Sequence, residues 1–524
     1  MPTVNIKNGQ SFCCPTGSTL LDALLQAGAF MESPCGGKGS CGKCKVRVLC
    51  GGGELHATER QLLRPEEIAD GLRLSCLLTV EEDMDVELLQ QERRHEILTA
   101  GYRPDFRIDG EEGCGVALDI GTTTIAAALL DLHSGRELAQ ASDINPQKQY
   151  GLDVLSRISY EYEKGEEGIK QLQRVLVSCI DRLLQKLCES AGIEKRELRR
   201  IVVAANCAMT HMLLGEDARP LGRAPYAPRF LNAQQCRACD LGLDCSEDTQ
   251  LICLPQVSAY IGGDIVAGAS VCQLENSKDT VLFIDIGTNG EIILAHEGRL
   301  LSCSCAAGPA LEGMNISCGM RAAEGAVEDL KITDTVELKT IGAAPPAGLC
   351  GSGILAAVRE LLKGGYVKKT GAFVPLDKAP QPPILRLNGT KREAVLCEKP
   401  ELIVTQDDLR QVQLAKGAIL SGFRVLLKEA GISMEQLDSV IIAGQFGAHL
   451  PVDSLIGIGL LPEQLRNKLS YVGNSSRTGA EMALLSAEKR REMEELATKI
   501  DYIELAQTAD YERIFAESLS FQIN

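Results

Sequence analysis

The chain has 524 residues and a formal net charge of −17 at pH 7, with 45% hydrophobic and 24% charged residues. This length allows roughly two to four domains that fold around their own cores without disulfide bonds. The excess of acidic residues argues against binding to nucleic acid, because a phosphate backbone requires clustered lysine and arginine. Tryptophan is absent and aromatic residues make up only 4% of the chain, so platforms for stacking bases are not expected either.

The N-terminal residues 1–10 have neither the basic region nor the apolar stretch of a secretory signal. No apolar run approaches the ~18 residues that a membrane span requires. We therefore expect a cytoplasmic protein with no membrane partner. The chain has 21 cysteines. In a reducing compartment, cysteines serve as metal or cluster ligands or as small buried residues more often than as disulfides.

Residues 1–92 are predicted to form a small α+β domain. Strands are expected at residues 4–6 and 10–13, joined by a tight Asn-Gly turn. A helix is expected over residues 20–27, because threonine and serine hydroxyls precede it and can cap its N-terminus.

Four cysteines of this segment have the spacing of an iron–sulfur site: Cys35, Cys41, Cys44 and Cys76. Their order, C-x5-C-x2-C followed by a distant fourth cysteine, resembles that of β-grasp ferredoxins with adrenodoxin-like spacing. Glycines between the first three thiols would let the loop wrap closely around a cluster. A [2Fe–2S] cluster is therefore predicted. Zinc is the alternative, although zinc sites usually pair two C-x2-C units. Cys50 competes as a ligand, but a glycine turn follows it, and the remaining cysteines are expected to be buried.

After a linker at residues 93–112, the chain is predicted to form a nucleotide-binding region of two subdomains, residues 113–275 and 276–524. Each subdomain begins with an apolar strand, an Asp-Ile-Gly-Thr turn and a second apolar strand. Such turns present backbone N–H groups and threonine hydroxyls to phosphate oxygens, and the aspartate can hold Mg²⁺ directly or through water. One turn alone is a weak signal, whereas two predict duplicated subdomains that face one cleft.

We predict that this cleft binds ATP and Mg²⁺, with Asp119 and Asp285 as its catalytic carboxylates. A glycine-rich turn after the strand at residues 440–443 resembles the adenosine motif of the sugar kinase, heat-shock chaperone and actin superfamily. The segment at residues 348–353 resembles the second connecting motif of that superfamily. The predicted nucleotide contacts are Gly121, Thr122, Thr123, Thr124, Gly287, Thr288, Asn289, Gly444, Gln445 and Gly447.

The expected fold class is therefore α/β multidomain, with a β-grasp ferredoxin domain followed by a two-subdomain RNase-H-like ATPase. Together with the segments at residues 206–215, 262–268, 307–313 and 317–322, this combination resembles the reductive activators of corrinoid proteins over essentially the whole chain. The resemblance implies that one electron passes, at the expense of ATP, from the [2Fe–2S] cluster to Co(II) of a corrinoid protein in a methyltransferase system. Co(I) is thereby restored.

The resemblance also implies a low-potential electron donor, such as a ferredoxin or flavodoxin, and a corrinoid carried by the partner. A homodimer is left open. Two other functions share these motifs. Activators of 2-hydroxyacyl-CoA dehydratases share the nucleotide fold, but they hold a [4Fe–4S] cluster between two subunits. A small-molecule kinase with a redox-sensing ferredoxin domain would phosphorylate a metabolite without a protein partner. A chaperone-like ATP switch is disfavoured, because no β-rich substrate domain follows residue 447.

Some residues outside these motifs have two interpretations. A second cysteine group could hold zinc or another cluster, although coincidence is the commoner explanation; its members are Cys236, Cys239, Cys245 and Cys253. Helices are expected at residues 167–191 and 406–429. Lys416 in the second helix could reach the nucleotide, but a solvent-exposed helix face is more common. His211 and His449 are each interpreted as structural residues rather than as ligands.

Overall fold

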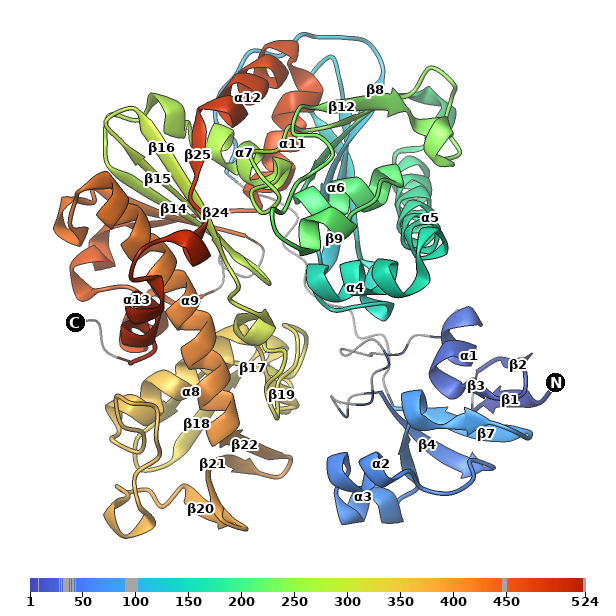
Figure 1. Ribbon diagram of the computed structural model, residues 1–524, viewed down its shortest axis with the longest axis vertical. Helices are drawn as coiled ribbons and strands as arrows, with labels where there is room; N and C mark the ends of the chain where they lie inside the picture. Colours follow the sequence, from blue (N-terminus) through green and yellow to red (C-terminus); the bar gives the residue numbers. More distant parts are fainter. Residues whose placement is uncertain are drawn as a thin grey trace.

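The computed structural model describes residues 1–521 except 8, 28, 30, 32–36, 38, 40, 41, 43, 90–101 and 445–449. Four predicted site residues therefore lie outside the described residues: Cys35, Cys41, Gln445 and Gly447. The same holds for His449. In the part of the chain that is described, no helix has the length and apolar character needed to cross a membrane. Figure 1 shows an N-terminal domain in blue and two larger α/β halves that follow it.

The N-terminal domain is built on one five-stranded sheet in the order β2-β1-β7-β4-β5. Its central strands β1 and β7 run parallel, and the other neighbours are antiparallel. The helix α1 (Leu20–Gln26) is capped by the Thr19 side chain and packs onto the sheet through Leu20 and Leu24. This is the predicted β-grasp arrangement, and the expected hairpin and first helix are confirmed. The strands are β1 Thr3–Ile6, β2 Ser11–Cys13, β4 Lys45–Cys50, β5 Leu72–Leu74 and β7 Met84–Leu88.

Each larger half contains a six-stranded sheet, in the orders β10-β9-β8-β11-β13-β12 and β24-β23-β14-β15-β16-β25. In both sheets three antiparallel strands come first in the chain, and two strands parallel to the first are then added on its other side. This repeated order is that of the RNase-H-like fold, so the predicted duplication is confirmed. The strands are β8 Cys114–Ile120, β9 Thr124–Asp131, β10 Glu137–Ile144, β11 Leu198–Ala205, β12 Gln234–Arg237, β13 Gln250–Cys253, β14 Val281–Ile286, β15 Gly290–His296, β16 Arg299–Cys305, β23 Ser439–Ala443, β24 Leu469–Gly473 and β25 Ile500–Tyr502.

Helices cover both faces of these sheets. The long helices α5 and α9 begin and end within one residue of the ranges expected from the sequence. Two shorter helices, α7 and α11, lie between the two sheets (Figure 1). In sequence, α11 belongs to the predicted second subdomain, but it packs on β8 and β11 of the first sheet. The boundary between residues 275 and 276 therefore stays a prediction. The helices are α4 Val154–Lys164, α5 Glu166–Ala191, α6 Cys207–Leu214, α7 Gly263–Val271, α8 Gly351–Lys363, α9 Gln406–Ala430, α10 Val452–Gly457, α11 Ser475–Leu485, α12 Ala487–Lys499 and α13 Tyr511–Ser518.

Lys416 on α9 is fully buried, so neither interpretation of this residue was correct. Its Nζ donates a hydrogen bond to the carbonyl of Ser518 at 2.9 Å and another to that of Ser520. Burial lowers the pKa of Lys416 to about 7. The Lys416 amino group therefore fastens the C-terminal segment to α9, because backbone carbonyls accept the hydrogen bonds of this buried donor.

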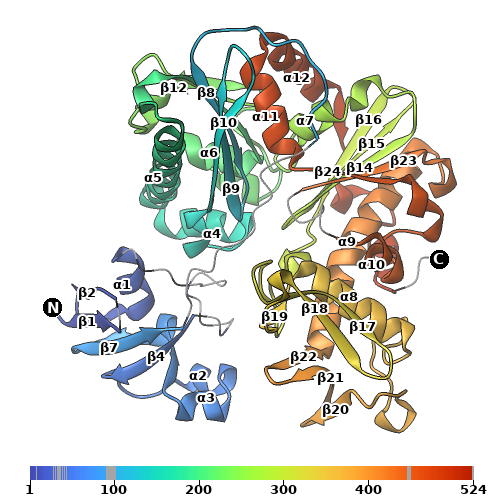
Figure 2. The same ribbon diagram turned by 180° about the vertical axis from the view of Figure 1, so that it is seen from behind.

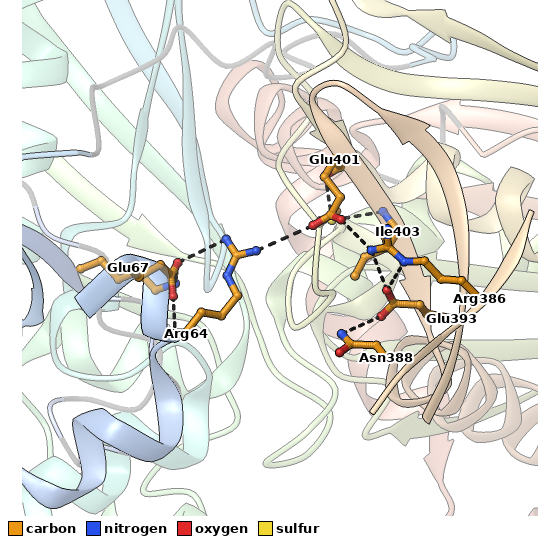
Figure 3. Close-up of polar contacts among 9 residues, drawn as sticks. Arg64, Glu67, Arg386, Asn388, Glu393, Glu401 and Ile403 are labelled. Atoms are coloured by element: carbon orange, nitrogen blue, oxygen red, sulfur yellow. Dashed lines mark hydrogen bonds and ion pairs between the residues drawn. The ribbon is translucent and has the colours of Figure 1, made fainter. Parts of the chain in front are cut away.

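The N-terminal domain meets the second half at a small sheet that includes β21 (Lys391–Glu398) and β22 (Glu401–Thr405). Arg64 lies 3.7 Å from Glu401 and 3.6 Å from Glu67, while Arg386 holds Glu401 at 2.6 Å and Glu393 at 2.7 Å (Figure 3). Arg64 is 69% and Glu401 42% exposed, so their pair is worth roughly 0–1 kcal/mol. The contact is weak enough to open reversibly.

Reversing the charge at Arg64 should release the N-terminal domain. In Arg64→Glu two carboxylates face each other, so the radius of gyration from small-angle scattering at low ionic strength should exceed that of the wild type. Added salt should narrow the difference, because it screens exposed charges. The matched control is Arg60→Glu, an equal charge change on the neighbouring helix α2 (Ala57–Leu62). Equal radii for the two variants would show that the ion pair does not hold the domain.

Candidate functional site

The two Asp-Ile-Gly-Thr turns face one polar cavity of about 110 Å³ between the halves. All the predicted catalytic and nucleotide-contact residues that the structure describes line this cavity: Asp119, Gly121, Thr122, Thr123, Thr124, Asp285, Gly287, Thr288, Asn289 and Gly444. Sequence reasoning missed several of the other lining residues. These are Asn206, Asp264, Glu291, Glu312, Asn474 and Ser476. The two turns thus share one cleft, as predicted, while the roles of the residues that line it stay predictions.

The first turn, between β8 and β9, is held from behind by buried donors. The Asn145 side chain donates to the carbonyl of Gly121 at 2.9 Å, and the guanidinium of Arg157 donates to the carbonyl of Thr122. The Asn206 amide donates to the Thr122 hydroxyl at 3.1 Å. Arg157 is fully buried, and burial lowers its pKa to about 9. These bonds fix the backbone of the turn, while its threonine side chains stay at the cavity.

Asp119 is the penultimate residue of β8 and is oriented by a residue far along the chain. Asn474, the N-cap of α11, donates from its side-chain amide to Asp119 Oδ2 at 2.8 Å. Burial raises the pKa of Asp119 to about 6, although this hydrogen bond and the charge of Arg477 oppose the rise. A helix packed between the sheets therefore positions one of the two predicted catalytic carboxylates.

The other cavity carboxylates raise one another's pKa. Burial, then the charges of Asp264 and Asp119, raises the pKa of Asp285 to about 8. Burial and the charge of Asp119 raise that of Asp264 to about 7. The pKa of Glu291 lies well above its ordinary value for the same reasons. Without a cation the cavity therefore keeps protons near neutral pH, and a divalent cation would displace them.

This donor set fits Mg²⁺ bound together with phosphate. Mg²⁺ keeps several waters and usually takes one or two protein carboxylates plus substrate phosphate oxygens. Among the residues that the structure describes, no group of three or more His, Cys, Asp or Glu side chains is arranged to hold a metal by itself. The cavity therefore suits a metal–nucleotide complex better than a bare ion.

Gly444 follows β23 and touches the Asp285 side chain. Its φ is +92°, and a Cβ there would lie 2.6 Å from both Asp285 Oδ1 and the Ile286 carbonyl oxygen. Glycine is therefore required twice, for backbone conformation and for space. The adenosine-like turn begins at this residue, so the same glycine sets the position of a predicted catalytic carboxylate.

We expect Gly444→Ala to displace Asp285 and to weaken Mg-ATP binding by at least ~10-fold, equivalent to about 1.4 kcal/mol. The matched control is Gly431→Ala, where φ is +72° and no atom lies within 4 Å of the added Cβ. It should cost about 1 kcal/mol of stability through strain alone and leave nucleotide affinity unchanged. Isothermal titration and thermal unfolding of both variants separate the two effects. Equal affinities would contradict the clash.

Two of the four predicted cluster ligands lie together in the N-terminal domain. The Sγ atoms of Cys44 and Cys76 are 3.3 Å apart, and both residues are buried. Pairing of β4 with β5 and a 2.9 Å bond from Ser75 N to the Cys44 carbonyl hold the two segments side by side. Two buried thiols this close fit ligands of one metal centre. Cys50 is exposed, as is Cys13, so the expected burial of non-ligand cysteines is wrong for these two.

A buried ion pair supports the segment that carries Cys76. Glu59 is fully buried and lies 2.9 Å from Arg73. It also accepts hydrogen bonds from the backbone N–H groups of Leu74 at 2.8 Å and His56 at 2.9 Å. Burial alone would raise the pKa of Glu59, but these bonds outweigh it and hold the pKa below its ordinary value. The ionised carboxylate thus fixes β5 two residues before Cys76, a predicted cluster ligand.

We expect Glu59→Gln to lower the stability of the N-terminal domain by about 2 kcal/mol, because buried donors lose a charged acceptor. The visible absorbance of the predicted iron–sulfur cluster should then be lost faster in air or with a chelator than in the wild type. The control is Glu87→Gln, which removes a partly exposed carboxylate paired with Lys7 and Arg47 on the same sheet. Cluster lifetimes that match in the two variants would show that Glu59 does not support the ligand segment.

The second cysteine group does not form a site among the described residues. Cys236 and Cys253 lie on adjacent strands, but no metal-binding group of three or more side chains forms there. His211 is a structural residue, as predicted. It is buried, stacks on Phe230 with ring centroids 4.4 Å apart, and accepts a hydrogen bond from Arg229 N at 3.1 Å.

The fold and the two sites define an iron–sulfur type of domain joined to an ATPase of the sugar kinase and actin type. Models of three protein families match the chain. They are the 2Fe-2S iron-sulfur cluster binding domain over residues 3–81, the RACo middle region over 114–277 and the C-terminal ASKHA domain of RACo over 279–524.

Relatives match along nearly the whole chain. The corrinoid activation enzyme RamQ of Eubacterium limosum is 30% identical, with 93% of this chain and 94% of that protein covered. The [Co(II) methylated amine-specific corrinoid protein] reductase of Methanosarcina barkeri is 24% identical, with 78% and 77% covered. A solved reductive activator for corrinoid, iron-sulfur protein has 30% identity and a TM-score of 0.70, with 99% and 98% covered. The chain therefore belongs to the RACo family of corrinoid activation proteins.

Proposed function

We propose that this chain is an ATP-dependent reductive activator that passes one electron to Co(II) of a partner corrinoid protein and thereby restores Co(I). One observation carries the proposal: the same chain contains a pair of buried thiols in a β-grasp domain and two Asp-Ile-Gly-Thr turns that face one cavity. The likeness to a corrinoid activation enzyme over 93% of the chain supports the choice of electron acceptor.

The two sites have separate tasks in this proposal. Cys35, Cys41, Cys44 and Cys76 would hold a [2Fe–2S] cluster, which supplies a one-electron relay when bound. Asp119 and Asp285 would hold Mg²⁺, and the threonines of the two turns would bind the phosphates of ATP. Each transfer removes one electron from the reduced protein and adds it to Co(II), so a low-potential donor such as a ferredoxin or flavodoxin must then reduce the protein again.

ATP is needed because Co(I) is a strong reductant and the electron moves uphill. Each ~59 mV of unfavourable potential for one electron lowers the equilibrium constant tenfold. A conformational change can offset this only if one state binds the partner more tightly by a comparable free energy. The cavity between the two halves supports such a coupling, because a nucleotide held there would contact both halves at once.

Surface charge bears on the partner. A net charge of −17 favours a corrinoid protein with a basic contact surface, since complementary charge speeds encounter. The association should therefore weaken with added salt. A homodimer stays a hypothesis, to be tested by size-exclusion chromatography with light scattering.

The direct test is anaerobic. Chemically reduced protein is mixed with a Co(II) corrinoid protein from the same organism, and the Co(I) absorbance is followed with and without Mg-ATP. Growth of the Co(I) band should require ATP. Cys76→Ser should abolish it, and Asp285→Ala should slow it by ~10–100-fold, as expected for lost contacts to a charged group. Cys50→Ser, which changes an exposed cysteine, should be unaffected.

The alternatives predict different outcomes. Phosphoryl transfer to a small metabolite in the absence of any partner protein would support a kinase with a redox sensor. Co(I) formation at the same rate without ATP would leave the nucleotide cleft without its proposed role. No Co(I) with an intact iron–sulfur spectrum and a functional partner would overturn the proposal.

A further inference from the structure

The hydroxyls of the two phosphate turns are engaged with a carboxylate of the protein itself. Thr288 Oγ1 donates a 2.7 Å hydrogen bond to Glu312 Oε1, and Thr123 Oγ1 lies 3.3 Å from Thr288 Oγ1. A hydroxyl has one proton. Since Thr288 gives its proton to Glu312, Thr123 is the donor in its contact with Thr288, and a hydrogen bond from Thr123 also acts on Glu312. The donors from both halves are therefore directed towards this one side chain.

Glu312 occupies the place of an anion in the cleft. It ends the short 3₁₀ helix Pro309–Glu312 and is only 2% exposed. Burial raises the pKa of Glu312, but hydrogen bonds from Thr288 and Thr123 and the charge of Arg321 oppose the rise. A phosphate group needs the same hydroxyl donors. Two anions that compete for them in a buried site repel each other strongly.

An unused partner for Glu312 lies beside it. Arg321 is buried, with only 9% of its surface exposed. Its Nε and Nη1 atoms have no hydrogen-bond partner among the described residues. A Cβ at Gly313 would lie 2.4 Å from the Met320 carbonyl oxygen, so the segments that carry Glu312 and Arg321 run side by side. A buried guanidinium with unsatisfied N–H groups is costly, and a carboxylate is its natural partner.

We propose that Glu312 is a positioning residue that senses the phosphates of ATP, with Arg321 as its second partner; this inference rests on the proposed function. In the free protein Glu312 holds Thr123 and Thr288 together across the cleft. When phosphate takes these hydroxyls, Glu312 turns to the unpaired N–H groups of Arg321. The contact between the two turns is then replaced by contacts through the nucleotide, so the relative position of the halves depends on ATP.

The proposal predicts opposite effects for the two members of one pair. Glu312→Gln makes the competing side chain neutral, so Mg-ATP should bind ~10-fold more tightly to the holoprotein. Arg321→Met removes the second partner, so Mg-ATP should bind ~10-fold more weakly. The double variant should deviate from the sum of the two, because the residues act on each other. Isothermal titration under anaerobic conditions measures all four affinities.

Two further readouts separate this role from a purely structural one. Thermal stability should change little in Arg321→Met, because the loss of a charge that favours ionised Glu312 is offset by removal of unsatisfied buried hydrogen-bond donors. The ATP concentration that gives half-maximal Co(I) formation should shift in the same opposite directions as the binding constants. Weaker ATP binding in both variants, or no change in Glu312→Gln, would overturn the inference. If the wild-type protein itself does not bind ATP, the proposed function fails, and this inference fails with it.

Discussion

Close packing of α7 against α11 is the contact on which both halves of the ATPase region depend. A Cβ at Gly479 of α11 would lie 2.5 Å from the Ala267 Cβ on α7, and a Cβ at Gly268 would lie 2.8 Å from Phe283 and 2.9 Å from Ser475. Small residues let the helices approach closely enough to share one core between the two sheets. An added methyl group in such a place typically costs about 1–3 kcal/mol.

This packing also assembles the site. The N-cap of α11 is Asn474, whose amide holds Asp119, and the first turn of α7 carries Asp264, which lines the same cavity. The helix that closes the core and the residue that orients a carboxylate are therefore parts of one element. Movement of one half relative to the other would have to shift the contacts between these two helices. Core packing and the electrostatics of the cleft are thus linked physically and not merely adjacent.

Much of the architecture could be predicted from the sequence, because it is encoded locally. The repeated Asp-Ile-Gly-Thr turns, each between apolar strands, indicated both sheets and the cavity they share, and the cysteine spacing indicated the N-terminal domain. Positions of regular elements such as α5 and α9 followed from apolar periodicity. Each turn and each helix is indicated by residues close together in the chain, and the cysteine pattern is recognisable because three of its four members lie within ten positions.

The parts that could not be predicted depend on distant residues or on burial of a polar group. Arg157 and Asn145 hold the first turn through its carbonyl groups, and nothing in their local sequence distinguishes them from ordinary helix and loop residues. Lys416 looks like a surface lysine until the C-terminal carbonyls that surround it are known. Glu291 could have been found, because hairpin pairing places it directly opposite Asp285.

The position of the N-terminal domain connects the two sites. It lies beside α4 in both views (Figures 1 and 2), and Asp22 of α1 is near enough to Tyr160 of α4 to help raise the pKa of that tyrosine, after burial and Tyr150. The same domain reaches the second half through Arg64 and Glu401. Because α4 also carries Arg157, which grips the first phosphate turn, one helix joins the nucleotide cleft to the surface that faces the electron-carrying domain. In the proposed function, movement of the two halves would strain these weak contacts. A nucleotide bound in the cleft would then influence where the thiols of Cys44 and Cys76 are presented.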